Sequence, residues 1–133
     1  MAQSHNAESH PYFPSGDWEG FYLYRSGPGA ERHPMRCQLD FADGKVTGGG
    51  SDDVGAFRWQ GVYSTVEMSC RMVKQYATHV IFYDGRADES GVYGTWSQGA
   101  YFSGGFHLWP KQGGNEEEAV AEKVDAKQLA GAC

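Results

Sequence analysis

Lys74, His79 and Tyr83 are three ionisable residues that lie close together in the sequence. Side chains alternate between the two faces of a strand, so His79, Ile81 and Tyr83 share one face. If that face points inward, His79 and Tyr83 can act as an acid–base pair near neutral pH or orient a polar ligand group. The alternative is a histidine bound by a neighbouring strand's backbone or exposed on the outer face, and we favour that alternative.

The run Gly48–Gly50, Ser51, Asp52 and Asp53 has the residue types to bind a hard cation through carboxylates or an anion through backbone amides. It lacks the spaced carboxylates of an EF-hand loop, and no helix follows it as in a phosphate loop. We therefore expect a flexible connection between strands here. Asp84-Gly85 and Asp88 are likewise interpreted as turn residues.

Three arginines occupy positions that alternate with apolar residues: Arg36, Arg58 and Arg71. If they pointed inward, they would form a cationic floor for a carboxylate ligand. We expect them on the surface instead, because the opposite face carries the apolar side chains. Those side chains are Met35, Leu39, Phe41, Trp59, Met68 and Met72.

The elements that must position these residues are short strands. Apolar residues alternate with polar ones from Met35 to Phe41, and Asp43-Gly44 follows as a tight hairpin turn. The same pattern predicts eight strands, near Trp18–Arg25, Met35–Phe41, Lys45–Thr47, Val54–Ser64, Val66–Val73, Thr78–Tyr83, Gly91–Ser97 and Ala100–Trp109.

Links of a few residues make consecutive strands antiparallel neighbours, and eight such strands can remove their exposed edges by closing into an up-and-down barrel. A sandwich is the alternative, but glycines within the strands, such as Gly20 and Gly61, suit the bends of a barrel. We expect an all-β barrel domain at residues 15–110, a disordered arm at 1–14 and an acidic tail at 111–133. That tail is expected to be a frayed helix or disordered.

The order of these features resembles the calycin barrels, and within them the streptavidin and avidin family. The resemblance rests on Gly16-Asp17-Trp18, on Gly48–Ser51 with Phe57, Gly61, Tyr63 and Ser64, and on Lys74, Tyr76, His79, Tyr83 and Gly85. It covers roughly residues 16–110 and implies the family's barrel architecture.

Biotin binding is not implied, because the expected polar contacts are missing. Glu19–Phe21 stand where the family has an asparagine and a serine, and Val80–Phe82 replace serine and threonine contacts. Ser51 can still correspond to a contact serine, and Trp96 or Trp109 can form a pocket wall.

Composition excludes several partners. The chain has 133 residues and a net charge of −6, without a concentrated basic face, which argues against nucleic acid. No apolar run approaches the ~18 residues of a membrane span, and a signal peptide is not apparent, so we expect a cytoplasmic protein without a membrane partner. Cys37 and Cys70 are expected to be reduced core residues and Cys133 an exposed thiol; no metal site or cofactor is expected.

Three functions follow. The first is binding of a small apolar or aromatic molecule inside the barrel, because methionines and tryptophans with a few polar groups are typical of such pockets. The predicted lining is Trp18, Met35, Trp59, Met68, Met72, His79, Tyr83, Trp96 and His107. The second is an enzyme that uses His79 and Tyr83 in proton transfer. The third is an interaction module, with possible homo-oligomers, that uses Tyr12, Phe13, Tyr101 and the acidic tail.

Overall fold

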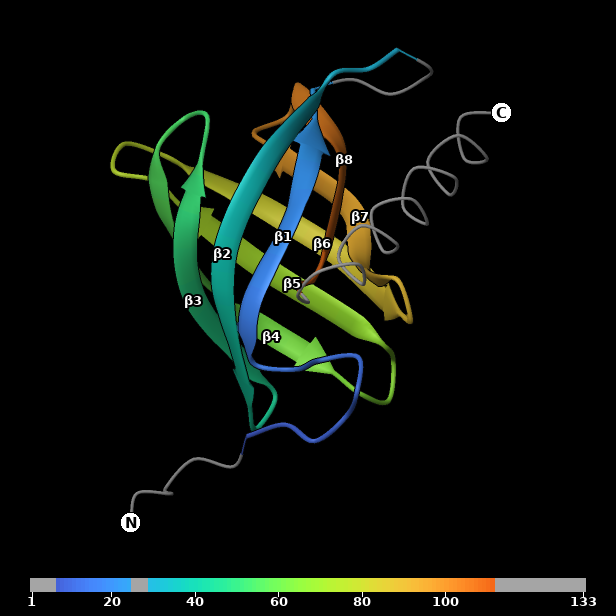
Figure 1. Cartoon of the computed structure of the whole chain (residues 1–133). Helices are drawn as coiled ribbons and strands as arrows, with labels where there is room; N and C mark the ends of the chain where they lie inside the picture. Colours follow the sequence, from blue (N-terminus) through green and yellow to red (C-terminus); the bar gives the residue numbers. More distant parts are fainter. Residues whose placement is uncertain (1–6, 25–28, 112–133) are drawn as a thin grey trace.

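The computed structural model describes residues 7–24 and 29–111, and these form one closed barrel of eight antiparallel strands in sequential order (Figure 1). The strands are β1 (Gly16–Leu23), β2 (Arg32–Ala42), β3 (Lys45–Asp52), β4 (Ala56–Ser64), β5 (Ser69–Gln75), β6 (Val80–Asp88), β7 (Gly91–Gln98) and β8 (Phe102–Pro110). All eight predicted strands are confirmed, with shifts at their ends.

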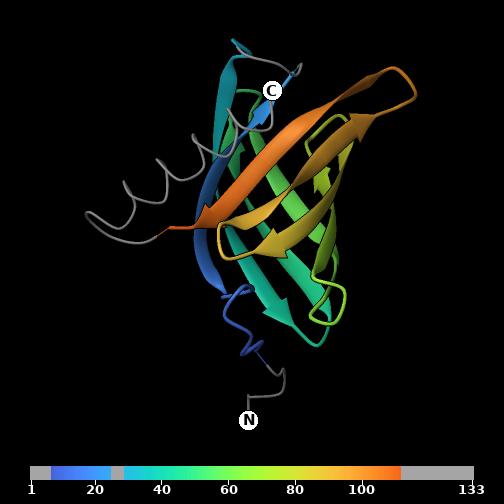
Figure 2. The same cartoon turned by 90° about the vertical axis from the view of Figure 1, so that its right-hand side faces the viewer.

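The first and last strands close the barrel. Trp18 of β1 lies opposite Cys37 of β2 on one side and opposite Pro110 of β8 on the other. Figure 2 shows β8 beside β1. The predicted up-and-down barrel is therefore confirmed, and the sandwich alternative is wrong.

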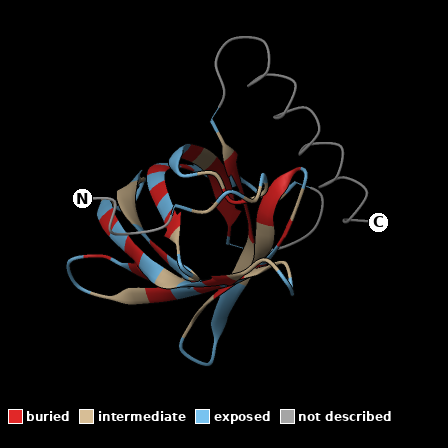
Figure 3. Ribbon diagram, turned by 90° about the horizontal axis from the view of Figure 1, so that it is seen from below, coloured by how far each residue is buried: buried red, intermediate tan, exposed pale blue. Residues whose placement is uncertain are grey.

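Alternation divides each strand between core and surface, as the buried and exposed bands in Figure 3 show. In β2, Met35, Cys37, Leu39 and Phe41 are buried and the residues between them are exposed. The three arginines predicted to face outward, Arg36, Arg58 and Arg71, are exposed.

The two cysteines of the core are free and buried, as predicted. Burial raises the pKa of the Cys37 thiol to about 11 and that of the Cys70 thiol to about 12. Both therefore stay protonated at neutral pH, and they pack as small apolar groups.

The turn between β2 and β3 has the predicted form. Asp43 and Gly44 both have positive φ angles, of 53° and 78°, and Ala42 pairs with Lys45 across the two-residue loop. A turn with two positive φ angles matches the twist of the strands that it joins.

The glycine run is not a loop, so the prediction of a flexible connection is wrong. Gly48–Asp52 belong to β3 and pair with β2, and Gly48–Ser51 also pair with β4. A Cβ atom at Gly50 would lie 2.1 Å from the Arg36 carbonyl oxygen and 2.5 Å from the Cys37 Cβ atom. The glycines allow a close approach of two strands, which sequence reasoning interpreted as flexibility.

The turn predicted at Asp84-Gly85 is also wrong, because β6 continues through both residues to Asp88. Gly85 faces the core, where an added Cβ atom would lie 2.9 Å from the Phe106 ring. Packing against Phe106 therefore requires this glycine. The prediction for Asp88 is confirmed, since its carboxylate accepts hydrogen bonds from the Ser90 backbone N–H and hydroxyl in the turn that follows.

The prediction of a disordered N-terminal arm is wrong for its described residues 7–14, which are held against the barrel. The Glu8 amide donates to the Phe41 carbonyl, and the Tyr63 hydroxyl donates to the Glu8 carboxylate. Phe13 has no exposed surface and packs against Phe41 and Tyr63. Phe13 thus closes the end of the barrel at which β2 turns into β3.

Some predictions fall outside the described residues, namely those for residues 1–6, for the tail at 112–133 and for Cys133. Within the described part of the chain, no helix is long and apolar enough to cross a membrane.

The Phe13 contact yields a stability prediction. Replacing this fully buried ring in Phe13→Ala removes it from the core and leaves a cavity, so we expect a loss of about 3 to 5 kcal/mol in the free energy of unfolding. Urea denaturation followed by circular dichroism measures it. Tyr101→Ala, at a side chain that is 92% exposed, is the control and should change little. An unchanged stability for Phe13→Ala would contradict the role of Phe13 as a plug.

Candidate functional site

The open end of the barrel, which we call the mouth, lies opposite Phe13. The odd-numbered strands end there and the even-numbered strands begin, so residues 53–55, 76–79 and 99–101 connect strands around it. Polar side chains from β3 and β5 point into the barrel just below this rim. They form the candidate site.

A buried ion pair stands at the centre of the site. The Lys74 Nζ atom of β5 lies 2.5 Å from Oδ2 of Asp52 at the end of β3, and neither side chain has any exposed surface. The Tyr76 hydroxyl donates a second hydrogen bond to the same carboxylate oxygen. Lys74 and Asp52 lie on the inward faces of β5 and β3 because each is an even number of residues from a buried apolar neighbour, and Tyr76 follows directly after β5.

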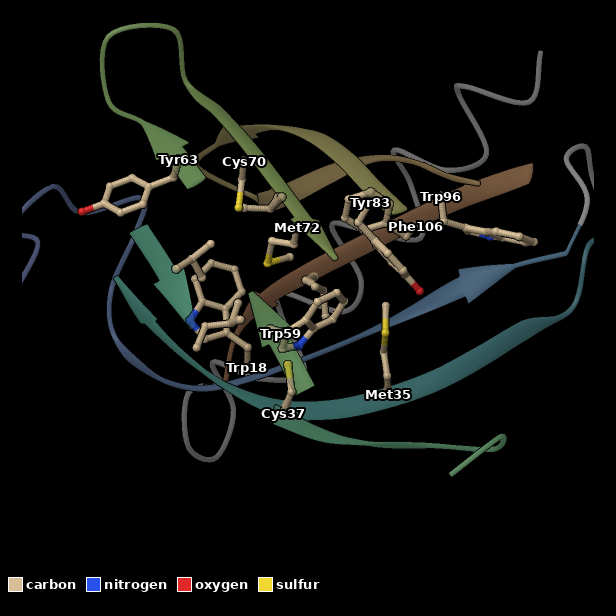
Figure 4. Close-up of a cluster of buried hydrophobic side chains, with 14 of the residues drawn as sticks. Trp18, Met35, Cys37, Trp59, Tyr63, Cys70, Met72, Tyr83, Trp96 and Phe106 are labelled. Carbon is tan, nitrogen blue, oxygen red and sulfur yellow. The ribbon is translucent and has the colours of Figure 1, made fainter. Parts of the chain in front are cut away.

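The remaining contacts of the Lys74 ammonium come from other strands. Nζ lies 3.4 Å from the Met35 sulfur and 3.1 Å from the Tyr83 hydroxyl oxygen. Figure 4 shows Met35 and Tyr83 approaching one another in the core. Nζ also lies 4.4–5.5 Å from the centres of five aromatic rings, those of Phe57, Tyr22, Tyr83, Tyr76 and Trp59. In place of water, the buried ammonium therefore contacts one carboxylate, two weaker acceptors and the faces of the surrounding aromatic rings.

Burial dominates the electrostatics of this cluster. Desolvation lowers the pKa of Lys74, against the opposing effect of the Asp52 carboxylate. Desolvation raises the pKa of Tyr76, and its hydrogen bond to Asp52 raises it further. The tyrosine therefore remains a neutral donor at physiological pH.

A second carboxylate at the rim joins two further side chains. Asp53 accepts a hydrogen bond from the Tyr22 hydroxyl through Oδ1, and its Oδ2 lies 2.7 Å from Nδ1 of His33. The His33 ring stacks on Tyr22, with centroids 4.9 Å apart. Burial opposes ionisation of Asp53, but the bonds from Tyr22 and His33 hold the pKa of this carboxyl below its usual value.

A half-open pocket of about 60 Å³ lies directly at the mouth. Its walls are mostly aromatic, and its lining consists of Tyr22, Tyr24, Val54, Tyr76, His79, Ile81, Tyr83, Trp96 and Gln98. An engineered cavity of ~150 Å³ encloses benzene, so an aromatic ring entering this smaller pocket stays partly exposed unless side chains move.

Three of the nine predicted ligand-binding residues line this pocket: His79, Tyr83 and Trp96. His79 lies half-buried in the connection before β6, stacks on Tyr76 at 4.7 Å and places Nδ1 2.9 Å from the Thr78 hydroxyl. The structure thus brings His79, Ile81 and Tyr83 to one pocket. The sequence analysis favoured a His79 that is exposed on the outer face or bound by backbone, and the structure does not show this arrangement.

Four other predicted residues, Trp18, Met35, Trp59 and Met72, are buried in the core below the pocket. Their side chains fill the barrel, and only Met35 and Trp59 approach the Lys74 ammonium. Below the pocket, these side chains pack against one another in the core (Figure 4).

The structure separates Met68 and His107 from the mouth. Met68 lies in the turn before β5 at the opposite end, with a φ angle of 54°. His107 is buried on the outer face of β8, where its ring contacts Phe21, Tyr93 and Trp109, because Phe106 and Leu108 take the inward positions. Of the two possible wall tryptophans, Trp96 lines the pocket and Trp109 joins this outer cluster.

Sequence reasoning missed Tyr22 and His33, interpreted Asp52 and Asp53 as part of a flexible connection, and gave Lys74 no place in the core. Alternation carried a signal for two of them. Met72 was assigned to the inward face, and Lys74 lies two residues further on the same face. Asp52 likewise shares the face of Val46, but the glycines between them disguised the strand.

Among the residues described, no group of three or more His, Cys, Asp or Glu side chains is arranged to hold a metal ion. Comparisons of the chain with known protein families, curated proteins and solved structures give no match.

The buried ion pair leads to a prediction about stability. Lys74→Met leaves the Asp52 carboxylate buried without its cation, and we expect this variant to lose about 3 to 5 kcal/mol in the free energy of unfolding. Combining it with Asp52→Leu removes both charges, so most of the loss should be recovered, although Tyr76 and the backbone N–H groups of Val54 and Gly55 then lack this acceptor.

Chemical denaturation of the single and double variants measures this coupling. Lys45→Met, at an exposed lysine of β3, is the matched control. If the double variant were as unstable as the sum of both single changes, the two side chains would not be coupled and the assigned ion pair would be wrong.

Proposed function

We propose that the protein binds a small, neutral aromatic or apolar molecule in the pocket at the barrel mouth. The observation that supports this most strongly is that three aromatic residues of the pocket wall, Tyr22, Tyr76 and Tyr83, also surround the ammonium of the buried ion pair. Apolar walls with a few fixed polar groups are typical of small-molecule sites.

The ion pair itself favours a functional role for this end of the barrel. Removing two charges from water costs several kcal/mol for each ion, and well-packed apolar residues often stabilise a core equally well. The barrel core below Lys74 shows this alternative, because Met72 and Cys70 occupy the preceding inward positions of β5. Of these inward positions of β5, the one that carries a lysine is the one nearest the pocket. We therefore attribute this lysine to ligand binding rather than to folding stability.

The small volume of the pocket restricts both the size of the ligand and its affinity. The interior is filled, so a ligand enters at the mouth and contacts Tyr24, Tyr76, Trp96 and their neighbours by one edge. A single ring system that stays partly exposed gives a dissociation constant on the order of 1 mM for a fragment without further polar contacts.

The resemblance to calycin barrels supports the same site, since an eight-stranded meander barrel with one open end is the architecture that it implies. A closer similarity to streptavidin and avidin remains part of this proposal. Ser51, the serine that sequence analysis matched to a contact residue, is exposed on β3, whereas Tyr83 and Trp96 line the pocket. We therefore expect a ligand other than biotin.

One observation also favours the second candidate, an enzyme. His79 and Tyr83 both line the pocket, as a proton-transfer pair requires. The third candidate is an interaction module. Phe13 is fully buried and cannot contact a partner there, whereas Tyr101 is 92% exposed and can. Binding at the mouth is common to the first two candidates and is the property to test first.

Indole tests the proposed binding. We expect it to bind to the purified protein with a dissociation constant on the order of 1 mM, followed by chemical-shift changes in a ¹⁵N-labelled sample. The changes should centre on pocket residues, including the indole N–H of Trp96. Val54→Asp should weaken binding about fivefold, since it places a charge where the pocket wall is apolar.

Val62→Asp is the matched control. Val62 is 54% exposed and Val54 is 50% exposed, but only Val54 lines the pocket. The control should bind as the unchanged protein does. Shifts spread over the outer surface, or none at millimolar indole, would refute the proposed function.

A further inference from the structure

We propose that the mouth pocket selects neutral molecules carrying a carbonyl oxygen, and that the Tyr83 hydroxyl donates the hydrogen bond that recognises this oxygen. The inference rests on the proposed function, because it names the ligand class for the same pocket. It follows from a count of donors and acceptors in the site.

The Tyr83 hydroxyl has a proton to donate. An ammonium group can only donate, so the 3.1 Å contact between Lys74 Nζ and the Tyr83 oxygen makes that oxygen the acceptor. Among the described residues, no acceptor for the proton of this hydroxyl lies within hydrogen-bond distance. Tyr83 is 3% exposed and lines the pocket. A buried hydroxyl without an acceptor is costly, and a ligand oxygen removes that cost.

The other tyrosine hydroxyls next to the ion pairs are already engaged. Tyr76 donates to Asp52, and Tyr22 donates to Asp53. The Trp96 N–H donates to the Leu23 carbonyl oxygen. The remaining polar side chains of the lining reach solvent, because Tyr24 is exposed and His79 and Gln98 are half-buried. Tyr83 is thus the fully buried donor available to a ligand among the described lining residues.

Packing holds Tyr83 in place. Its ring meets Trp59 edge to face at 4.9 Å and Phe106 at 4.7 Å. A side chain locked on both sides directs its hydroxyl without a further loss of conformational entropy when the ligand arrives.

The neighbouring charges decide between a neutral and an anionic oxygen. The Lys74 charge is offset by Asp52, and Asp53 adds a second carboxylate at the rim. Desolvation and the Asp52 charge raise the pKa of Tyr83, so the hydroxyl keeps its proton at neutral pH. The donation from Lys74 to the Tyr83 oxygen polarises the O–H bond and strengthens its own donation. These conditions favour a ketone, amide or ester over a carboxylate.

A set of probes of nearly equal shape tests this selection. Acetophenone carries the carbonyl, α-methylstyrene replaces its oxygen by a methylene group, benzoate is an anion and benzylammonium is a cation. Dissociation constants come from titrations followed by NMR. We expect Tyr83→Phe to weaken acetophenone about fivefold to tenfold while leaving α-methylstyrene unchanged or tighter.

Tyr63→Phe is the matched control, since Tyr63 is a buried tyrosine at the closed end whose hydroxyl donates to Glu8. It should leave both dissociation constants unchanged. A second measurement uses the unaltered protein, so that a folding defect of Tyr83→Phe does not decide the matter. The infrared carbonyl stretch of bound ¹³C-labelled acetophenone should lie at lower frequency than in an apolar solvent.

The outcomes separate this inference from the proposed function. If neither acetophenone nor α-methylstyrene binds, the proposed function fails and the inference fails with it. If both bind but Tyr83→Phe affects them equally, or the carbonyl stretch matches that in an apolar solvent, the pocket binds aromatic rings and only the inference is overturned. Tighter binding of benzoate or benzylammonium than of acetophenone would also overturn it.

Discussion

The ion pair between Lys74 and Asp52 is the interaction on which the rest of the mouth depends. Two charges without any exposed surface can be held only if their hydrogen-bonding capacity is met, and the barrel meets it from four strands. Met35, Tyr76 and Tyr83 supply further side-chain contacts, and the backbone N–H groups of Val54 and Gly55 donate to Oδ1 of Asp52. The positions of two of the four pocket tyrosines, Tyr76 and Tyr83, are therefore fixed by contacts with this ion pair.

The two ends of the barrel differ in the side chains that they carry. At the closed end, Phe13 joins Phe41 and Tyr63 in an aromatic plug, and the Glu8 carboxylate accepts a hydrogen bond from the Tyr63 hydroxyl. At the mouth, carboxylates, an ammonium and several phenols lie among aromatic rings. An apolar plug opposite a polar, half-open mouth leaves the described part of the barrel with one end suited to a ligand.

Sequence patterning was sufficient for the architecture, because alternation from Met35 to Phe41 and similar runs identify strands, and short links determine their order. It was insufficient for the site for a physical reason. Asp52 and Lys74 meet only when β3 and β5 are both aligned with β4, so that Gly50 pairs with Phe57 and Trp59 pairs with Lys74. Alternation indicates which face a residue takes, but not the register that brings two charges together. The same limit applies to Phe13, whose burial depends on where the arm folds back.

The most direct test of the buried ion pair is to measure the hydrogen exchange and the titration of the Lys74 ammonium. In protein labelled with ¹⁵N at the lysine side chains, and with Lys74→Met to assign the signal, we expect one ammonium resonance that exchanges slowly with water. It should titrate below the ordinary lysine value of 10.5, because burial lowers the pKa of Lys74. It should also shift when indole is added, because Tyr83 contacts both the ammonium and the pocket. A Lys74 signal that exchanges rapidly, titrates with the exposed lysines and does not shift with indole would contradict both the buried ion pair and the proposed binding at the mouth pocket.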